Sequence, residues 1–402
     1  MDSCHLCRKR DLLSLIDFGE HPIAHHFLTE PSEEEYIHRV DLRFCEDCGH
    51  FQLTNPIPPE RLYTRYNWLS SWKPQPHVPR LVQLIEGLPA LKPTSRIIEV
   101  GSNDGSFLEV LFKHGYRSVL GVEPAQDAQE TARQKGVETV GACFNREVAH
   151  SLVSAYGKYD LFIARQVLEH IADLEEFREA MCILLRPGSY VLFEVPNFDF
   201  SLAASDYSAI WEEHVNYFTL QTLSRFLANA GIKIIHSETA NFSGEALIAL
   251  GEYVEGLLFP LEGAYLGKHR AQALGYRDLW PTFREALIGY LCSYRERGGK
   301  VAVYGAGCRA CSLINFAGLG PHLEFVLDDQ PEKQGKYMPG SRLSILPGSV
   351  LEERPVELCL LAVNAENEEK VLARHQAYEQ MGGRFHSLHP PSSRLLPIWG
   401  HI

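Results

Sequence analysis

Four cysteines near the start of the chain have the spacing of metal ligands. Cys4 and Cys7 form one C-x-x-C pair, and Cys45 and Cys48 form a second. Each pair places two thiolates on a tight turn, and two such turns complete a tetrahedral set of four sulfur ligands. Because cysteines would fill all four positions, the site has no open position. We therefore predict a structural zinc ion here.

A second group of residues that could do chemistry lies between Ile210 and Phe218. This segment holds two adjacent carboxylates, an imidazole and three aromatic rings: Trp211, Glu212, Glu213, His214, Tyr217 and Phe218. A histidine is suited to proton abstraction near neutral pH, and a flanking carboxylate can orient it or raise its basicity. The alternative is a loop histidine bonded only to its neighbours. The crowding of polar and aromatic groups favours a functional segment.

A glycine loop marks the element that would bind a ligand. Residues 97–100 read as a buried strand, 101–105 as a tight turn, and 107–112 as a helix with an apolar stripe. A strand, a glycine turn and a helix form the first unit of a doubly wound α/β sheet, which binds ligands at the carboxyl ends of its strands. Glu123 ends the next strand, where a ribose-binding carboxylate is expected, although it could be a surface carboxylate.

The remaining central strands are predicted at 140–144, 161–164, 191–195, 233–237 and 246–250. The last two lie close together in the sequence and suggest an antiparallel edge. The segment containing His214 follows the strand that ends at Val195, which places it over the carboxyl end of the sheet. Cys143, Cys182, Cys292 and Cys359 lie among apolar residues and are predicted to be core residues.

The C-terminal third carries a second glycine loop. A strand at 301–304 precedes Gly305, Gly307 and Ala310, a G-x-G-x-x-A pattern, and Asp328 and Asp329 end the next strand. This pattern alone would indicate NAD, the cofactor of a rival enzyme class, but a single match is weak. Cys308 and Cys311 form a third C-x-x-C pair at the start of a helix. Helix packing is the favoured interpretation and redox activity the alternative.

Length and charge limit the function classes. The 402 residues predict two to three domains, at about 150 residues per domain. The 38 Lys and Arg against 51 Asp and Glu give a net charge of −13, without a basic run, so nucleic acid is disfavoured as a partner. The sequence has neither an apolar run long enough to span a bilayer nor a hydrophobic stretch at its polar start. We therefore expect a cytoplasmic protein with reduced thiols.

Three segments resemble the class I S-adenosylmethionine (SAM) methyltransferases. Residues 99–105, Glu-Val-Gly-Ser-Asn-Asp-Gly, look like their motif I, residues 161–170 like the motif after their fourth strand, and residues 184–188 like the turn before their fifth. In such a fold Gly101 would let the backbone approach the methionine part, and Glu123 would bind the ribose. The resemblance implies SAM binding by Glu99, Gly101, Asn103, Asp104, Glu123, Cys143, Phe144 and Gln166.

The whole chain is similar to the three-domain sugar C-methyltransferases. The matching motifs include Glu213-His214 before Tyr217-Phe218, and residues 304–307 and 326–340. The resemblance implies a zinc module at 1–78, a methyltransferase domain at 79–255 and a Rossmann-like sugar-nucleotide clamp at 256–402, without a nicotinamide. It further implies a nucleotide-linked 4-keto sugar methylated at C3, His214 as the base, Glu213 as its partner, and a monomer. Substrate-binding residues would be Trp211, Tyr217, Ser70, Ser71, Arg309 and Lys336.

Some residues depart from the family pattern. Trp211 stands where the family usually has a tyrosine, Phe242-Ser-Gly-Glu245 replaces a histidine–glycine word, and Arg309 replaces a lysine. These departures bear on the acceptor rather than on the cofactor. The alternatives are O- or N-methylation of a related sugar or small metabolite, and a non-catalytic protein that binds a sugar nucleotide.

Overall fold

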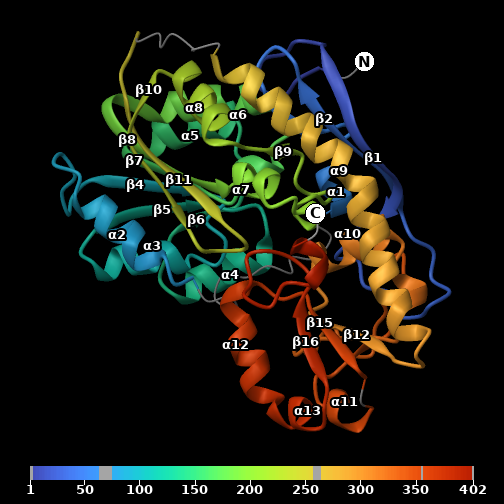
Figure 1. Cartoon of the computed structure of the whole chain (residues 1–402). Helices are drawn as coiled ribbons and strands as arrows, with labels where there is room; N and C mark the ends of the chain where they lie inside the picture. Colours follow the sequence, from blue (N-terminus) through green and yellow to red (C-terminus); the bar gives the residue numbers. More distant parts are fainter. Residues whose placement is uncertain (1–2, 63–74, 257–263, 355, 401–402) are drawn as a thin grey trace.

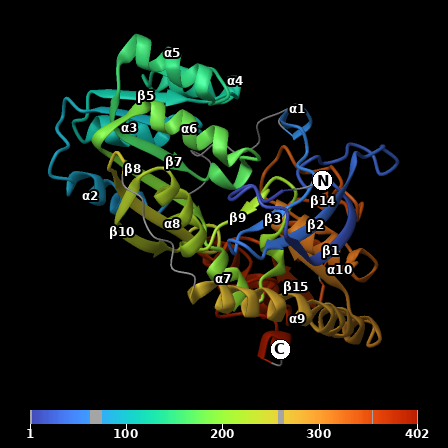
Figure 2. The same cartoon turned by 90° about the horizontal axis from the view of Figure 1, so that it is seen from above.

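The computed structural model describes residues 3–62, 75–256, 264–354 and 356–400. These residues form three β-sheets that follow one another along the chain and surround a common centre (Figures 1 and 2). The α/β class expected from the sequence is confirmed. In the described part of the chain, no helix is both long enough and apolar enough to cross a membrane.

The first sheet has a strand that comes from far along the sequence. Its order is β1-β2-β3-β9, all antiparallel neighbours. The strands are β1 (Leu12–Pro22), β2 (Ile37–Cys45), β3 (Phe51–Leu53) and β9 (Asn216–Tyr217), and the short helix α1 (Pro59–Leu62) follows β3. In β9, Tyr217 pairs with Phe51 and Asn216 with Gln52. The segment that was predicted to carry the base is therefore built into the N-terminal sheet.

The central sheet has the order β10-β11-β8-β7-β4-β5-β6, with the antiparallel strands at one edge as predicted. Its strands are β4 (Arg96–Val100), β5 (Ser118–Val122), β6 (Thr139–Val140), β7 (Tyr159–Arg165), β8 (Leu185–Pro196), β10 (Ile232–Ala240) and β11 (Ala246–Tyr253). Helices cover both faces, so Leu161–Ala164 of β7 and Tyr190–Phe193 of β8 are apolar and buried.

The helices of this region begin at residues that can cap them. Asn145, Asp173 and Thr219 accept hydrogen bonds from the first turns of α5, α6 and α8, respectively. The helical elements are α2 (Val78–Glu86), α3 (Ser106–Lys113), α4 (Gln126–Gln134), α5 (Arg146–Tyr156), η2 (Leu168–His170), α6 (Leu174–Leu184), α7 (Phe198–Ala203), η3 (Tyr207–Ala209) and α8 (Leu220–Asn229).

The strand predicted at 140–144 is wrong in its extent. Only Thr139–Val140 pairs with β5, and the chain then forms a loop that leads to the cap of α5 at Asn145. Cys143 lies in this loop and is exposed, whereas the sequence predicted a core residue. A short run of apolar residues that leads to a helix cap has the same sequence pattern as a short strand, so the pattern alone could not separate them. Of the other three cysteines, Cys359 is buried, and Cys182 and Cys292 are half-buried.

The third sheet is parallel, with the order β14-β13-β12-β15-β16. Its strands are β12 (Val301–Tyr304), β13 (Val326–Leu327), β14 (Ile345–Leu346), β15 (Leu358–Leu361) and β16 (Arg384–Ser387). The helical elements are α9 (Ala264–Arg295), α10 (Cys308–Ala317), η4 (Gly320–His322), α11 (Val350–Glu353), α12 (Ala365–Arg374), α13 (Gln376–Gln380) and η5 (Pro397–Gly400).

The long helix α9 joins the first and third sheets, and Figure 1 shows it running along both. Phe18 of β1 stacks on Phe316 of α10 at 4.2 Å between ring centroids and meets Trp280 of α9 at 5.2 Å. One apolar core includes residues of β1, β2, α7, α9 and α10. Because the N- and C-terminal parts share this core, they hold each other in fixed positions.

Candidate active site

A cleft of about 1940 Å³ opens where the three sheets meet. The central sheet contributes the loops after β4, β5, β7 and β8, and the C-terminal sheet contributes the loops after β12, β13 and β15. Ile57 and Leu62 of the N-terminal region also line it. The cleft therefore lies at the carboxyl ends of two parallel sheets, the position where such folds bind ligands.

The glycine loop after β4 forms one end of the cleft. Gly101 lines it with φ +67°, and a Cβ atom there would lie 2.4 Å from Cγ2 of Val167. No side chain fits in that space, so glycine is required. Asn103 also lines the cleft. This loop therefore faces the cleft, and its glycine is required by the packing of Val167 against it.

Glu123 lies at the end of β5, beside the glycine loop. Its carboxylate accepts hydrogen bonds from the backbone N–H groups of Asn103 and Ala125, both at 2.9 Å. Burial raises the pKa of Glu123, and the residue lines the cleft. The two backbone bonds fix the orientation of the carboxylate at the edge of the cleft.

A buried charge network supports the same end of the cleft. Burial raises the pKa of Glu99 to about 8, and its Oε2 has no hydrogen-bond partner among the described residues. Arg165 lies between Glu99 and Glu194, at 3.7 and 3.2 Å, over the ring of Phe107. Burial opposes ionisation of Glu194, but Arg165 and His77 outweigh it and lower its pKa to about 2.

Most of the residues predicted to bind the cofactor line this end. Glu99, Gly101, Asn103, Glu123, Cys143, Phe144 and Gln166 do so. Asp104 does not line the cleft, since its carboxylate accepts hydrogen bonds from Ser106 and pairs with Lys135 at 3.0 Å. Asp104 therefore stabilises the loop. The unpartnered oxygen of Glu99, the held carboxylate of Glu123 and the open backbone at Gly101 fit the amino group, ribose and methionine part of SAM.

His214 is one of the residues that line the cleft. Its ring stacks on Trp211 at 3.6 Å between centroids, and His170 stands perpendicular to it at 4.7 Å. All three line the cleft. Tyr217, predicted to bind substrate, does not, because its buried hydroxyl group donates to the carbonyl oxygen of Trp211 at 3.2 Å. Tyr217 thus supports the wall from behind.

The carboxylate of Glu213 points to a residue that the sequence did not single out. Its Oε1 lies 2.5 Å from Nδ1 of His25, and both side chains are 3% exposed. Burial favours the neutral forms, but the ion pair outweighs it, so the pKa of Glu213 is lowered and that of His25 is raised to about 8. Nε2–H of His25 donates to the carbonyl oxygen of Leu62 at 2.9 Å. His25 belongs to no motif, which is why sequence reasoning missed it.

The C-terminal end of the cleft combines a glycine loop with cationic side chains. Asp328 accepts hydrogen bonds from the backbone of Ala306 and Gln330 at 2.8 and 2.9 Å and pairs with Lys333 at 3.2 Å. The cations that line the cleft here are Arg309, Lys333, Lys370 and Arg374. Arg309 is held by Asp206 at 2.6 Å and by Ser208.

Only some of the residues predicted to bind substrate in this part line the cleft. Arg309 lines the cleft, but Lys336 does not, and Lys333 of the same sequence motif takes that position. Ser70 and Ser71 lie outside the described residues. Cys308 and Cys311 are buried in α10, and burial raises the pKa of both thiols well above the ordinary value. A protonated buried thiol is a packing group, in agreement with the favoured interpretation.

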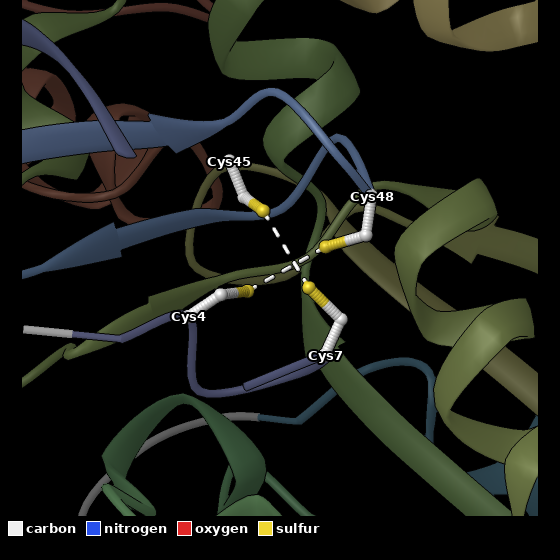
Figure 3. A group of neighbouring side chains, drawn as sticks. All are labelled: Cys4, Cys7, Cys45 and Cys48. Carbon is white, nitrogen blue, oxygen red and sulfur yellow. Dashed lines mark hydrogen bonds between the residues drawn. The ribbon is translucent and has the colours of Figure 1, made fainter. Parts of the chain in front are cut away.

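The four N-terminal cysteines converge on one point (Figure 3). The Sγ atoms of Cys4 and Cys48 lie 3.5 Å apart, those of Cys7 and Cys45 lie 3.6 Å apart, and all four lie within 4.8 Å of one another. Four zinc–sulfur bonds of about 2.3 Å in a tetrahedron put the sulfurs about 3.8 Å apart. The donor set and its spacing fit a structural zinc ion.

Three family models match the chain in order. They are a putative zinc binding domain at residues 4–63, a methyltransferase domain at 75–237 and a C-methyltransferase C-terminal domain at 268–390. The chain is 28% identical over 400 residues to C-methyltransferase NovU of Streptomyces niveus, covering 96% of this chain and 94% of that one.

Other similarities concern the central region. A ubiquinone biosynthesis O-methyltransferase of Chelativorans sp. is 25% identical over 223 residues, covering 52% of this chain and 84% of the relative. The crystal structure of a SAM-dependent methyltransferase from Archaeoglobus fulgidus is 18% identical, with a TM-score of 0.36, and covers 44% of this chain and 92% of that one.

Proposed function

Because the chain belongs to the three-domain, zinc-containing C-methyltransferases and uses SAM, we propose that it methylates a nucleotide-linked 4-keto sugar at C3. C3 is the carbon next to the ketone, and its hydrogen is acidic enough for a histidine to remove when the enolate is stabilised. The relative that matches nearly the whole chain and the family model of the C-terminal domain support C-methylation in general. The sugar, the position and the roles of individual residues are the proposed part.

One observation carries the proposal: a single cleft connects the cofactor loop, His214 and the cationic end of the C-terminal sheet. A sugar nucleotide has a reactive ring at one end and a charged diphosphate and base at the other. The proposed base lines this cleft, and four cationic side chains line its C-terminal end against two carboxylates, Asp328 and Asp329, which matches that polarity. Lys333, Lys370 and Arg374 would bind the phosphates, and the open loop at Gly305 and Gly307 would admit them.

In this proposal the residues around the reacting carbon have separate tasks. His214 takes the C3 proton on an imidazole nitrogen, and the electron pair of the C–H bond moves to the ketone oxygen to form an enolate. Trp211 covers one face of His214 and excludes water from it. When bound, SAM supplies an electrophilic methyl group that C3 accepts while S-adenosylhomocysteine leaves. Glu213, paired with His25, fixes the segment that carries the base.

The cofactor end would hold its ligand rigidly. The Glu123 carboxylate would accept hydrogen bonds from the ribose hydroxyls, Glu99 would face the charged amino group, and Phe144 would contact the adenine. Positioning the reacting atoms in one line supplies much of the acceleration in a methyl transfer.

The test is product analysis with a panel of nucleotide-linked 4-keto sugars and SAM. The proposal predicts a product that has gained one methyl group on carbon, identified by mass spectrometry and by carbon NMR, and no product with H214N. A methyl group on oxygen or nitrogen would overturn the C-methylation of this substrate class. So would transfer by H214N at the wild-type rate.

We further propose that the enzyme is a cytoplasmic monomer without a nucleic-acid partner. Its net charge of −13 repels polyanions. Light scattering after gel filtration would return the mass of one chain, and a dimer mass would overturn the monomer.

A further inference from the structure

A buried carboxylate next to the proposed base has no partner of its own. Glu169 lies in η2 and is 1% exposed, yet it is among the residues that line the cleft. Neither carboxylate oxygen has a hydrogen-bond partner among the described residues. Burying an unpartnered carboxyl group is costly, and folded proteins seldom keep one without a use.

The backbone places this carboxylate beside His214. The N–H group of Val215 donates to the carbonyl oxygen of Glu169 at 2.7 Å, and the side-chain amide of Asn216 donates to the carbonyl oxygens of Leu168 and Ile171 at 3.1 and 2.7 Å. These bonds attach η2 to the segment that carries His214. As a result, a carboxylate oxygen of Glu169 and ring nitrogens of His170 and His214 all lie within 4.8 Å of one another.

The other two glutamates of this wall are already engaged. Glu213 pairs with His25 at 2.5 Å, and Glu212 accepts a hydrogen bond from the backbone of Ala24 at 2.7 Å. Both contacts lead to the N-terminal sheet. Of these three buried glutamates, Glu169 is the one whose carboxylate is available to His214.

We propose that Glu169 is a positioning residue for the base, which holds the His214 ring and compensates the charge that forms on it. This inference deepens the proposed function and rests on it. In the reactive form Glu169 is ionised and His214 is neutral. Abstraction moves one proton from carbon to His214, and the C–H electron pair moves to the ketone oxygen. The resulting imidazolium then lies next to a carboxylate in a buried setting, where the attraction is strong.

The pH dependence follows from burial. Burial raises the pKa of Glu169 to about 8, so its ionised fraction, and with it the rate of proton abstraction, increases as the pH rises toward 8. Other ionisable groups surround this pair. His170 of η2 lies within 4.8 Å of both, Glu194 of β8 acts on Glu169, and Glu213 and His25 act on His170. His25 also titrates near pH 8 and stays intact in a Glu169 variant, which allows the two contributions to be separated.

The experiment compares the wild type with E169Q, E169D and E368Q. Glutamine keeps the shape of Glu169 and removes its charge, and aspartate keeps the charge. Glu368 is the matched control, since it is a buried glutamate with one unpartnered oxygen that does not line the cleft. The first readout is the rate of exchange of the sugar α-proton in deuterated buffer between pH 6 and 9. The second needs no sugar: NMR titration of the His214 ring, assigned with H214N.

We expect E169Q to slow exchange by about 10- to 100-fold and to lose the rise toward pH 8, with E169D partly restoring both. The His214 signals of the wild type should show a second inflection near pH 8 that E169Q lacks and E368Q keeps. SAM affinity and the melting temperature are measured on each variant to detect a folding failure. If E169Q does not fold, the pH profile and His214 titration of E169D test the role of Glu169 instead.

A wild-type pH profile and an unchanged second inflection in E169Q would overturn the inference, because the titrating group would then be His25. If instead the wild type exchanges no proton in any sugar, the proposed function fails. The His214 titration still decides the role of Glu169 in that case.

Discussion

His25 and Glu213 show at the scale of single residues how the wall of the cleft is charged. Removing one member of a buried ion pair leaves the other charge uncompensated, which typically costs about 3–5 kcal/mol. Because the pKa of His25 is raised from 6.5 to about 8, the pair gives its full stabilisation below pH 6.5 and loses it as the pH rises through 8.

H25Q should therefore lower the free energy of unfolding at pH 6 by more than at pH 9. The pKa shift alone corresponds to a difference of about 2 kcal/mol. Denaturant unfolding at both pH values measures it. H38Q is a suitable control, because burial lowers the pKa of His38 rather than raising it. An equal loss at both pH values would contradict a charged His25.

Gly101 tests the cofactor loop at the same scale. Alanine at this position would have a positive φ and a Cβ atom 2.4 Å from Val167, so we expect G101A to weaken SAM binding by at least about tenfold. Calorimetric titration with SAM measures this, and V167A in the same chain should restore part of the affinity. G289A is the control, since a Cβ atom there meets no other atom within 4 Å. Unchanged SAM affinity in G101A would mean that the loop does not approach the cofactor.

The residue-level predictions from sequence succeeded where a short motif fixes the geometry. The C-x-x-C pairs brought their four sulfurs together, and the loop containing Gly101 lies at the carboxyl end of its strand. They did less well for side chains that are set by long-range packing. Lys333 lines the cleft instead of Lys336, and the carboxylate of Glu213 points to His25, because turn geometry and contacts between domains decide these orientations.

At the scale of elements, β9 links the zinc site to the segment that carries His214, the proposed base. Asn216 of β9 contacts His5, which lies between Cys4 and Cys7, at 2.9 Å, and His50, which follows Cys48, at 3.0 Å. The backbone N–H of Leu53 donates to the carbonyl oxygen of Val215 at 3.0 Å. The metal thus stabilises the sheet that holds the segment of His214.

Loss of the metal should loosen this segment without unfolding the cofactor domain. In C48S, we expect a reduced zinc content and faster hydrogen exchange in peptides spanning 211–218, with unchanged exchange in α5 and a SAM affinity within about twofold of the wild type. Metal analysis and hydrogen-exchange mass spectrometry measure both. Unchanged exchange at 211–218 in zinc-free protein would show that the metal does not support the base.

Periodicity and glycine turns located most strands of the central sheet and β12 and β13 of the C-terminal sheet, but β9 was not predicted. A strand of two residues, Asn216–Tyr217, has no periodicity, and it forms only because Phe51 and Gln52 offer an open edge. The strand predicted at 140–144 shows the opposite error. Its apolar residues suggested a strand, but after Val140 they lie in a loop that faces the cleft.

At the scale of the whole molecule, the cleft exists because two sheets direct their carboxyl ends toward each other. A shared core of β1, α9 and α10 fixes the C-terminal sheet against the N-terminal one, and Arg309 with Asp206 ties it to the central region. The sequence predicted each domain from its own pattern. Their relative placement depends on packing between surfaces far apart in the chain, which no local pattern encodes.

Charge reversal can test whether the two ends of the cleft bind different ligands, SAM at one end and the nucleotide phosphates at the other. We expect K370E with R374E to weaken binding of a nucleoside diphosphate by about tenfold or more, because the phosphates lose two cations, and to leave SAM binding unchanged. Calorimetric titration with each ligand measures both affinities, and K113E on the exposed face of α3 is the control. Equal weakening of both ligands would contradict separate subsites.

In the proposed reaction, His214 removes a proton α to a ketone before methyl transfer. The most direct measurement is proton NMR of a nucleotide-linked 4-keto sugar with the enzyme in deuterated buffer, first without SAM and then with it. The claim predicts loss of the C3 hydrogen signal with the wild type but not with H214N, followed by a new carbon-bound methyl signal when SAM is added. A methyl group that forms on oxygen or nitrogen without enzyme-dependent exchange would contradict it.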